Sequence, residues 1–331
     1  MKKKEKMSPH IIAVTAFAAF IVLGLACATT DKKASEAVKS AASIDELAGL
    51  NDKLAWLELN AESGSSYVIE INSNETIQHS LLAYGGNLSY KNKSGITITI
   101  KGDDVNRTIN ANMPGRIFYV GQGVTLILED NITLQGYPYN QPRSIYFALV
   151  IVNSGGTLVM NEGATITGGT NNYSEGGGVA VSDGGTFLMN GGTISGNLCL
   201  VGPIKIEHVQ LGAATRAATS SAMARGANRS GIRGASNLNT APAAPAMPVA
   251  KGGGVYVSGR GTFTKTGGTI TGFASDQTSG NVVRDYNGNI MQGNGHAVYV
   301  DGAQVKRKET TAGPDVNLYY SNGQFSGAWD Y

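Results

Sequence analysis

The stretch Asp183-GGTFLMNGGTISG-Asn197 contains the pattern that decides the fold of this chain: a glycine turn, a short apolar run, a second glycine turn, then Thr-Ile-Ser-Gly. Two other stretches repeat it, Ser154-GGTLVMNEGATITGG-Thr170 before it and Arg260-GTFTKTGGTITG-Phe273 after it. The lead-in Gly176-GGVAVS-Asp183 is likewise repeated as Gly252-GGVYVS-Gly259. Self-similarity at a fixed period indicates a repeat architecture, in which each unit packs on its neighbours.

The spacing of the turn glycines indicates which repeat this is. Gly123, Gly156 and Gly185 follow one another in steps of 33 and 29 residues, and Gly261 comes 76 residues later because an insertion intervenes. Three short strands per step are typical of a parallel β-helix, whereas a propeller blade has four strands and a leucine-rich repeat alternates strand with helix. The sequence therefore predicts an all-β, right-handed parallel β-helix of about five layers over residues 60–331.

Positions that stay apolar between the repeats predict the inward-facing columns. The predicted columns are Leu158, Phe187 and Phe263; Ile166, Ile194 and Ile270; and Val152, Val181 and Val257. Another column changes from methionine, at residues 160 and 189, to lysine at residue 265. We expect that column to lie at a turn, because a lysine is rarely buried.

The N-terminal residues 1–26 are predicted to be a secretory signal peptide. A basic segment, Met1-KKKEK-Met7, precedes an apolar run that ends before Cys27. The end of that run, Leu23-Gly-Leu-Ala-Cys27, resembles the bacterial lipobox, which implies that Cys27 is the lipidated first residue and that 27–43 form a tether. The alternative is an ordinary signal peptide with a chance cysteine.

A short helix is predicted over residues 44–59. Ser43 and Glu46 have the spacing of a capping box, and Leu47, Leu50, Leu54 and Leu57 recur at helical intervals. We expect this helix to cover the open end of the stack, where unpaired backbone would otherwise invite edge pairing.

The repeat motifs Gly-Gly-Gly-Val-x-Val and Gly-Gly-Thr-Ile-Ser/Thr-Gly resemble those of right-handed parallel β-helix proteins, the pectate-lyase-type superfold. The ending, His296-AVYV followed by Thr311-AGPDVNLYYSNGQFSGA-Trp329, is similar to that of repeat-bearing bacterial surface lipoproteins, such as those of spirochaetes. The resemblance implies the fold and a place in the cell envelope. It implies little about activity, because one fold serves many functions.

An insertion at 198–250 interrupts the repeats. It is rich in Ala, Ser, Asn and Gly, and its cations include Arg216, Arg225, Arg229 and Arg233. Such a segment cannot bury enough apolar area to offset its ordering entropy, so we expect disorder. Two interpretations stay open: a basic loop that contacts an acidic glycan or host surface, and a solvated insertion without a role.

No catalytic residues are predicted. Asp103, Asp104 and His296 resemble parts of a polysaccharide-lyase site, but they lie about four layers apart, roughly 19 Å at about 4.8 Å per layer. The basic run 306–308 is expected to be a solvated loop, and Cys199 a buried or incidental thiol. The four histidines lack metal-ligand spacing, and the sequence indicates no metal or cofactor.

One loop carries aromatic residues that could contact a sugar. Tyr137, Tyr139 and Tyr146 flank it, and Arg143 could pair with a carboxylate. Exposed loops often carry function, although a longer turn along the side of the stack would look the same.

Together these features predict a lipid-anchored protein of the cell envelope, in the outer membrane, facing either the surface or the periplasm. We expect a structural or adhesive, ligand-presenting role without enzymatic activity. The alternatives are a carbohydrate-active enzyme or glycan-binding protein, and a periplasmic scaffold. The expected partners are the membrane and a host surface or acidic glycan, whereas a formal charge of +2 over 331 residues does not suggest nucleic acid.

Overall fold

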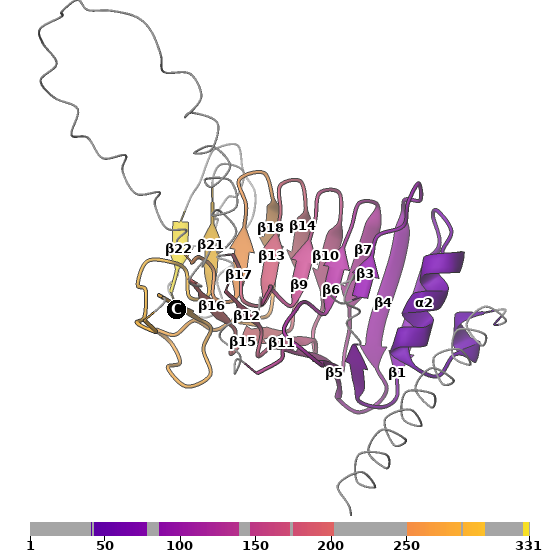
Figure 1. Cartoon of the computed structure of the whole chain (residues 1–331), viewed down its shortest axis with the longest axis horizontal. Helices are drawn as coiled ribbons and strands as arrows, with labels where there is room; N and C mark the ends of the chain where they lie inside the picture. The colour runs from indigo at the N-terminus through magenta and orange to yellow at the C-terminus, as the bar shows by residue number, and fades with distance from the viewer. Residues whose placement is uncertain are drawn as a thin grey trace, which may run out of the picture.

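The computed structural model describes residues 41, 43–77, 86–138, 146–172, 175–201, 250–285, 287–301 and 327–330. Within this part of the chain the structure is mostly β, and its strands form stacked sheets (Figure 1). The predicted signal peptide, Cys27, most of the insertion and the predicted strand at 316–320 lie outside the described residues.

Three long sheets and one short sheet make up the body. The first sheet contains β1 (Ser66–Ile71), β4 (Ile96–Gly102), β7 (Val124–Leu128), β10 (Thr157–Met160), β14 (Thr186–Met189) and β18 (Thr262–Lys265). The second contains β2 (Glu75–Ile77), β5 (Arg107–Ala111), β8 (Ile132–Gln135), β11 (Thr165–Thr167), β15 (Thr193–Ser195) and β19 (Thr269–Ile270). The third contains β3 (Gly86–Leu88), β6 (Phe118–Val120), β9 (Val150–Val152), β13 (Val179–Val181), β17 (Val255–Val257), β21 (Val298–Val300) and β22 (Gly327–Trp329). The short sheet contains β12 (Thr170–Asn171), β16 (Leu198–Leu200) and β20 (Val282–Arg284).

The chain passes through the sheets in the same order again and again, and we call each passage a coil. Coil one contains β1 to β3, coil two β4 to β6, coil three β7 to β9, coil four β10 to β13, coil five β14 to β17 and coil six β18 to β21. Every pairing between these strands is parallel, and each strand pairs with the equivalent strand of the next coil. The described residues thus form six coils, one more than predicted, because the short strands β2, β3 and β5 lack the glycine-turn signature.

The predicted inward columns are confirmed by the strand register. Leu158 lies opposite Phe187, and Phe187 lies opposite Phe263, with the two phenylalanine rings stacked at 5.0 Å between centroids. The isoleucine column and the valine column are also in register, and all of these side chains are at most 2% exposed. Their burial forms one continuous core along the stack, as alternation along a strand requires.

The expectation that Lys265 marks a turn is wrong. It lies within β18, in register with Met189, and is 2% exposed. The methionine column therefore faces inward along its whole length. Lys265 occupies the last position of that column, where its long aliphatic stem fills the place that methionine fills in inner coils.

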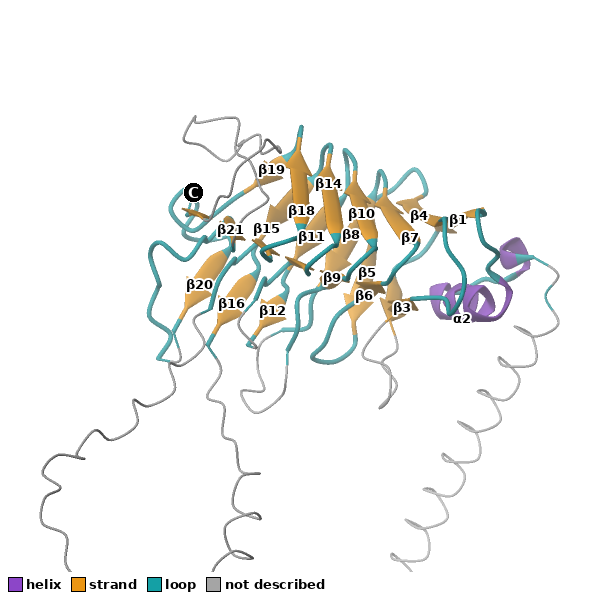
Figure 2. Ribbon diagram, turned by 90° about the horizontal axis from the view of Figure 1, so that it is seen from above, coloured by secondary structure: helices purple, strands orange, loops and turns teal. Residues whose placement is uncertain are grey.

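The N-terminal end of the stack is covered by a helix, as expected, but the helix begins later than predicted. A short 3-10 helix, η1 (Ile44–Glu46), is followed by α2 (Leu50–Asn60), which contacts β1, β2 and β3 (Figure 2). Ser43 makes no side-chain capping bond, and Leu47 is extended, with φ −98° and ψ 133°. The capping-box interpretation is thus wrong, since Gly49 is the N-cap of α2.

The insertion is shorter than the sequence indicates. Its predicted first residues form β16, which pairs with β12 and β20. Val201 and Ala250 are buried together with Cys199 and Val283 in a small second core. The residues on either side of 202–249 are therefore packed parts of coil five.

At the other end, β22 pairs antiparallel with β21 and extends the third sheet by one strand (Figure 1). Asp330, directly after β22, accepts a hydrogen bond from the backbone N–H of His296 at 2.9 Å. The last coil is thus covered along its third-sheet edge by the C-terminal residues, which reduces the exposed backbone that would invite pairing with another chain.

Candidate functional site

The third sheet carries a mixed column on its outer face. In β6, β9, β13, β17 and β21 the first and third residues point into the core. Because side chains alternate along a strand, the middle residue of each points outward. These middle residues are Tyr119, Ile151, Ala180, Tyr256 and Tyr299, one per coil in register. In the last two coils the outward residue is tyrosine, and the rings of Tyr256 and Tyr299 stack at 6.3 Å with an angle of 14°.

The glycine lead-in of each repeat folds the chain against this outer face. Gly252 has φ +72°, and a Cβ on it would lie 2.9 Å from the Cβ of Tyr256, so only glycine fits there. The residues before the turn are placed beside the tyrosines as a result. Glu175 and Lys251 form an isolated parallel bridge, which puts them at equivalent positions of coils four and five.

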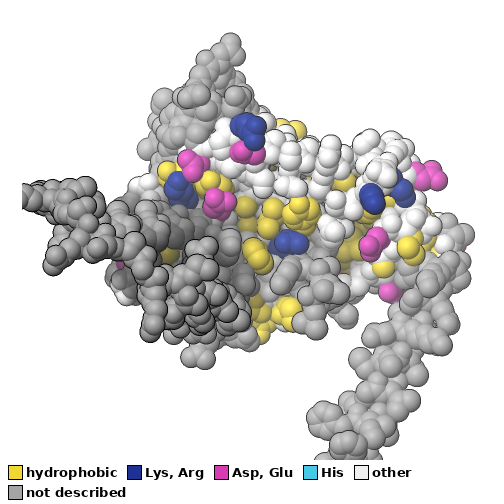
Figure 3. All heavy atoms as spheres, turned by 45° about the horizontal axis from the view of Figure 1, so that its top comes forward, with side chains coloured by type: hydrophobic (Ala, Val, Ile, Leu, Met, Phe, Trp, Pro, Cys, Tyr) yellow, Lys and Arg dark blue, Asp and Glu magenta, His cyan; other side chains and the backbone are white. Residues whose placement is uncertain are grey.

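These elements bring five side chains together, and we call the cluster the acid–tyrosine corner: Glu175, Lys251, Tyr256, Tyr299 and Asp301. It lies toward the C-terminal end of the stack, where Figure 3 shows acidic and basic side chains beside hydrophobic ones. Asp301 directly follows β21, and its backbone N–H donates to the carbonyl oxygen of Val257 at 2.8 Å. The backbone of Asp301 therefore continues the third sheet, beside the residues that follow β17.

Asp301 is the centre of the polar contacts in the corner. Its Oδ2 accepts a hydrogen bond from Lys251 Nζ at 2.8 Å and another from Tyr256 Oη at 3.2 Å. Lys251 Nζ also lies 4.7 Å from the centroid of the Tyr299 ring, a cation–π geometry. The side chains of Lys251 and Asp301 are 26% and 44% exposed, so the pair is open to solvent on one side.

Burial and charge shift the proton affinities in this corner. Burial raises the pKa of Tyr256, and the negative charges of Glu175 and Asp301 raise it further, so the phenol stays protonated and donates. Burial lowers the pKa of Lys251, but the hydrogen bond to Asp301 and the neighbouring charges raise it overall. Burial also raises the pKa of Glu175, although the nearby Tyr256 hydroxyl and Lys251 ammonium oppose this and the residue is exposed on one side.

The arrangement is suited to hydrogen bonding with a polar ligand at the surface. It offers carboxylate acceptors, an ammonium donor, a phenol that stays neutral and a half-exposed aromatic ring. In the described part of the chain, no lysine or arginine forms an ion pair with Glu175. Its carboxylate therefore retains its accepting capacity.

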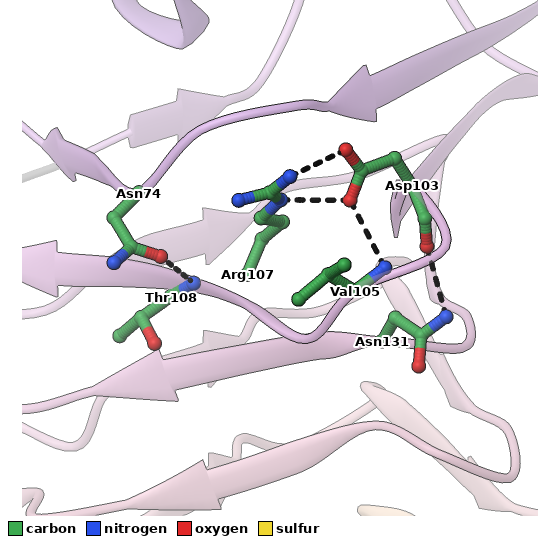
Figure 4. A network of polar contacts seen from close by, with 6 residues as sticks. All are labelled: Asn74, Asp103, Val105, Arg107, Thr108 and Asn131. Carbon is green, nitrogen blue, oxygen red and sulfur yellow. Dashed lines mark hydrogen bonds and ion pairs between the residues drawn. The ribbon is translucent and has the colours of Figure 1, made fainter.

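The acidic pair noted in the sequence has a different surrounding. The Asp103 carboxylate accepts hydrogen bonds from Arg107 Nε at 2.7 Å, from Arg107 Nη2 at 2.6 Å and from the Val105 N–H at 3.1 Å (Figure 4). The hydrogen bond from Arg107 holds its pKa below the ordinary value. Asp103 thus closes the turn between β4 and β5, and its neighbour Asp104 is exposed.

His296 lies in coil six, whereas Asp103 lies in coil two, and the two do not meet. Its Nδ1 accepts a hydrogen bond from the backbone N–H of Val283 at 2.9 Å, and the ring is fully buried. Val283 belongs to β20, the last described strand of the short sheet. The imidazole of His296 therefore supplies an acceptor for a backbone N–H at the edge of that sheet. The basic run 306–308 lies outside the described residues.

Cys199 is fully buried in β16. Burial raises the pKa of its thiol to about 12. The group is therefore a neutral thiol at physiological pH, and only a thiolate would be nucleophilic.

The predicted sugar-contact residues are placed only in part. Tyr137 is half-exposed and packs against the core, whereas Tyr146 is 1% exposed and offers no ring face to a ligand. The backbone N–H of Tyr146 donates to Asn172 Oδ1 at 2.9 Å, which anchors the end of that loop. The other candidates lie outside the described residues: Tyr139, Arg143, Arg216, Arg225, Arg229, Arg233 and the lipidation candidate Cys27.

The acid–tyrosine corner is not predicted from the sequence. A signal was present, because tyrosine takes the variable position of Gly-Gly-Gly-Val-x-Val at Tyr256 and again at Tyr299 in His296-AVYV. The carboxylates carry no such signal. Glu175 and Asp301 are 126 residues apart, and only the stacking of coils four to six brings them near one cluster.

Comparison with known proteins gives no relatives: no family model matches the chain, and neither a curated protein nor a solved structure matches it. Of the residues that the structure describes, none belongs to a helix long and apolar enough to cross a membrane. Over the same residues no three His, Cys, Asp or Glu side chains are grouped so as to hold a metal ion.

Proposed function

We propose that this chain is a lipid-anchored, ligand-presenting protein of the cell envelope, with a right-handed parallel β-helix as its rigid body and no catalytic role. The observation that carries the proposal is the regular stack, in which each coil adds one strand to every long sheet. Such a stack holds its outward side chains at fixed spacings of about 4.8 Å between coils. Right-handedness is the expected hand, since parallel crossover connections are almost always right-handed.

The proposed address rests on the N-terminal sequence. A basic segment, an apolar run and the lipobox-like end before Cys27 together favour export and lipid attachment. The outer membrane is the proposed site, with the body facing the surface.

The placement of the acid and base residues supports a role in binding rather than catalysis. Asp103 is engaged by Arg107 in a turn, and His296 is engaged by Val283 four coils away. A general acid and its partner must reach one substrate, which these residues cannot do together.

Two measurements test the proposal on cells that produce the protein. With Cys27→Ser we expect the protein to leave the detergent phase, and unchanged partition would overturn lipid anchoring. Protease added to intact cells should cut the arginine-rich insertion, whereas protection until the envelope is broken would favour the periplasmic scaffold instead. The proposed lack of catalysis would be overturned by polysaccharide turnover that is lost when a carboxylate is substituted.

Glycan binding is the second candidate, and a specific observation favours it. The acid–tyrosine corner combines carboxylates, a cation and an aromatic ring on an exposed face. This combination supplies hydrogen-bonding groups of both kinds beside an apolar ring, as a sugar requires.

A further inference from the structure

We infer that the acid–tyrosine corner binds a neutral, hydroxyl-rich sugar chain. The inference rests on the proposed ligand-presenting role, because it names the ligand and the place where that ligand is held. The corner is a candidate that the sequence pattern alone did not reveal.

The two carboxylates of the corner can each accept further hydrogen bonds. Both described hydrogen bonds to Asp301 go to Oδ2, from Lys251 and from Tyr256, which leaves Oδ1 available for a ligand hydroxyl. Glu175, two coils from Asp301, is exposed and lacks an ion-pair partner among the described residues. A carboxylate accepts at both of its oxygens, so two such groups suit hydroxyl groups at different positions of a sugar chain.

The ring of Tyr299 adds an apolar surface to the corner. It is partly exposed, Lys251 Nζ lies 4.7 Å from its centroid, and the ring of Tyr256 stacks beside it. A tyrosine presents an apolar body with a polar tip, which suits the C–H surface of a sugar with its hydroxyl rim.

The corner is already ordered before a ligand arrives. Tyr256 is only 4% exposed, and the glycine turn at Gly252 is packed against it. Lys251 is fixed by Asp301 and by the Tyr299 ring. Binding then immobilises few additional side chains, which reduces the entropic cost of association.

Charge favours a neutral ligand over an acidic one. Two carboxylates and one ammonium give the corner a formal charge of −1 when both acids are ionised. An acidic glycan would be repelled at this site, because like charges in contact are unfavourable. The contact with an acidic glycan that the sequence suggests concerns the basic insertion and not this corner.

The test uses the mature chain carrying Cys27→Ser and immobilised neutral oligosaccharides of glucose, galactose, mannose and N-acetylglucosamine, with uronic-acid oligomers beside them. We expect binding to at least one neutral oligomer. Tyr299→Ala and Asp301→Asn should each weaken it at least about tenfold, the effect of losing one good contact of about 1.4 kcal/mol. Tyr119→Ala, in the same outward column, and Glu70→Gln, an exposed carboxylate in coil one, should change it by less than about twofold.

Two further measurements keep the test decisive. Far-UV circular dichroism shows whether each variant folds, and chemical-shift changes of the Tyr299 ring in the otherwise unaltered chain report contact without any substitution in the corner. An absence of neutral-sugar binding, or binding that none of the corner variants weakens, overturns the inference.

The remaining outcomes separate the inference from the proposed function. Binding to uronic-acid oligomers alone, lost when residues 203–249 are deleted, would overturn the corner and leave the ligand-presenting role intact. Shortening of a neutral oligosaccharide that Asp301→Asn abolishes would support the corner as a sugar site and overturn the non-catalytic role.

Discussion

Asn197 and Asn281 lie in equivalent positions of coils five and six, and their side chains are joined by a hydrogen bond from Asn197 Nδ2 to Asn281 Oδ1 at 2.8 Å. Both residues are fully buried. The same series of hydrogen bonds, which we call the polar ladder, extends to coil four, where the backbone N–H of Gly169 donates to Asn197 Oδ1 at 2.8 Å. The ladder thus supplies partners for backbone groups at the bend between the second and short sheets.

Removal of one rung of this ladder should destabilise the protein strongly. In Asn281→Ala, the buried backbone N–H of Asn197 loses its acceptor, Asn281 Oδ1 at 3.1 Å. The carbonyl oxygens of Ile194 and Thr271 also lose a side-chain donor, at 2.8 and 2.7 Å, although each keeps a backbone donor. A buried polar group left unpaired costs about 1–3 kcal/mol, and with the further lost bonds we expect a loss of about 2–4 kcal/mol in a urea titration. Asn190→Ala is the matched control, since Asn190 is exposed. A loss as small as that of the control would show that the ladder is not structural.

Close stacking also explains the glycines of the lead-in. A Cβ on Gly253 would lie 2.5 Å from the carbonyl oxygen of His296 and 2.7 Å from the Val282 nitrogen, both in coil six. Gly253→Ala should therefore cost about 2–3 kcal/mol, since backbone atoms cannot move aside without displacing the next coil. Gly49→Ala has nothing within 4 Å of the new Cβ, and we expect it to cost at most about 1 kcal/mol. Thermal unfolding of the two variants, followed by circular dichroism, makes the comparison. Equal melting temperatures would contradict the close packing.

The parts of the fold predicted well from sequence are those where one residue type repeats for a physical reason. Phenylalanine at residues 187 and 263 is an example, because every coil needs an inward apolar side chain at that position. The end of the stack follows different rules. Lys265 and His296 break the repeat in coil six, where the inner-coil packing constraints no longer apply in full.

The role of His296 does not follow from the repeat pattern. It stands in the third copy of the lead-in, where Gly177 and Gly253 stand in the earlier copies. In those copies the following coil excludes a side chain, but after coil six the imidazole has room and accepts the N–H of Val283. The acid–tyrosine corner escaped prediction for a related reason, since nothing in the spacing of Glu175 and Asp301 indicates that stacking brings them together.

An inner and an end position of the methionine column should respond differently to opposite exchanges of methionine and lysine. Met189 lies between Met160 and Lys265 and is fully buried, so Met189→Lys would place an ammonium inside the core. We expect it to cost more than about 3 kcal/mol, because an isolated charge is expensive to bury. Lys265→Met should stay within about 1 kcal/mol of the original protein, since a hydrophobic replacement of similar volume is often neutral. Urea titrations at pH 7 measure the free energy of unfolding of both variants. A loss above about 1 kcal/mol for Lys265→Met would show that the lysine ammonium makes an essential contact.

His296 should make the stability of the last coil depend on pH. Burial lowers the pKa of the imidazole, with the Asp330 carboxylate opposing this and the Arg284 guanidinium adding to it. The folded protein then binds a proton less readily than the unfolded chain, so stability is fully present above the ordinary histidine pKa and falls as the pH drops below it. The slope for one proton is at most about 1.4 kcal/mol per pH unit. His296→Gln retains an acceptor for Val283 without titrating near neutrality. Urea titrations between pH 7.5 and 5 should show a smaller decline for this variant. Parallel curves for the two proteins would contradict the buried, neutral state of His296, because the remaining histidines are the same in both.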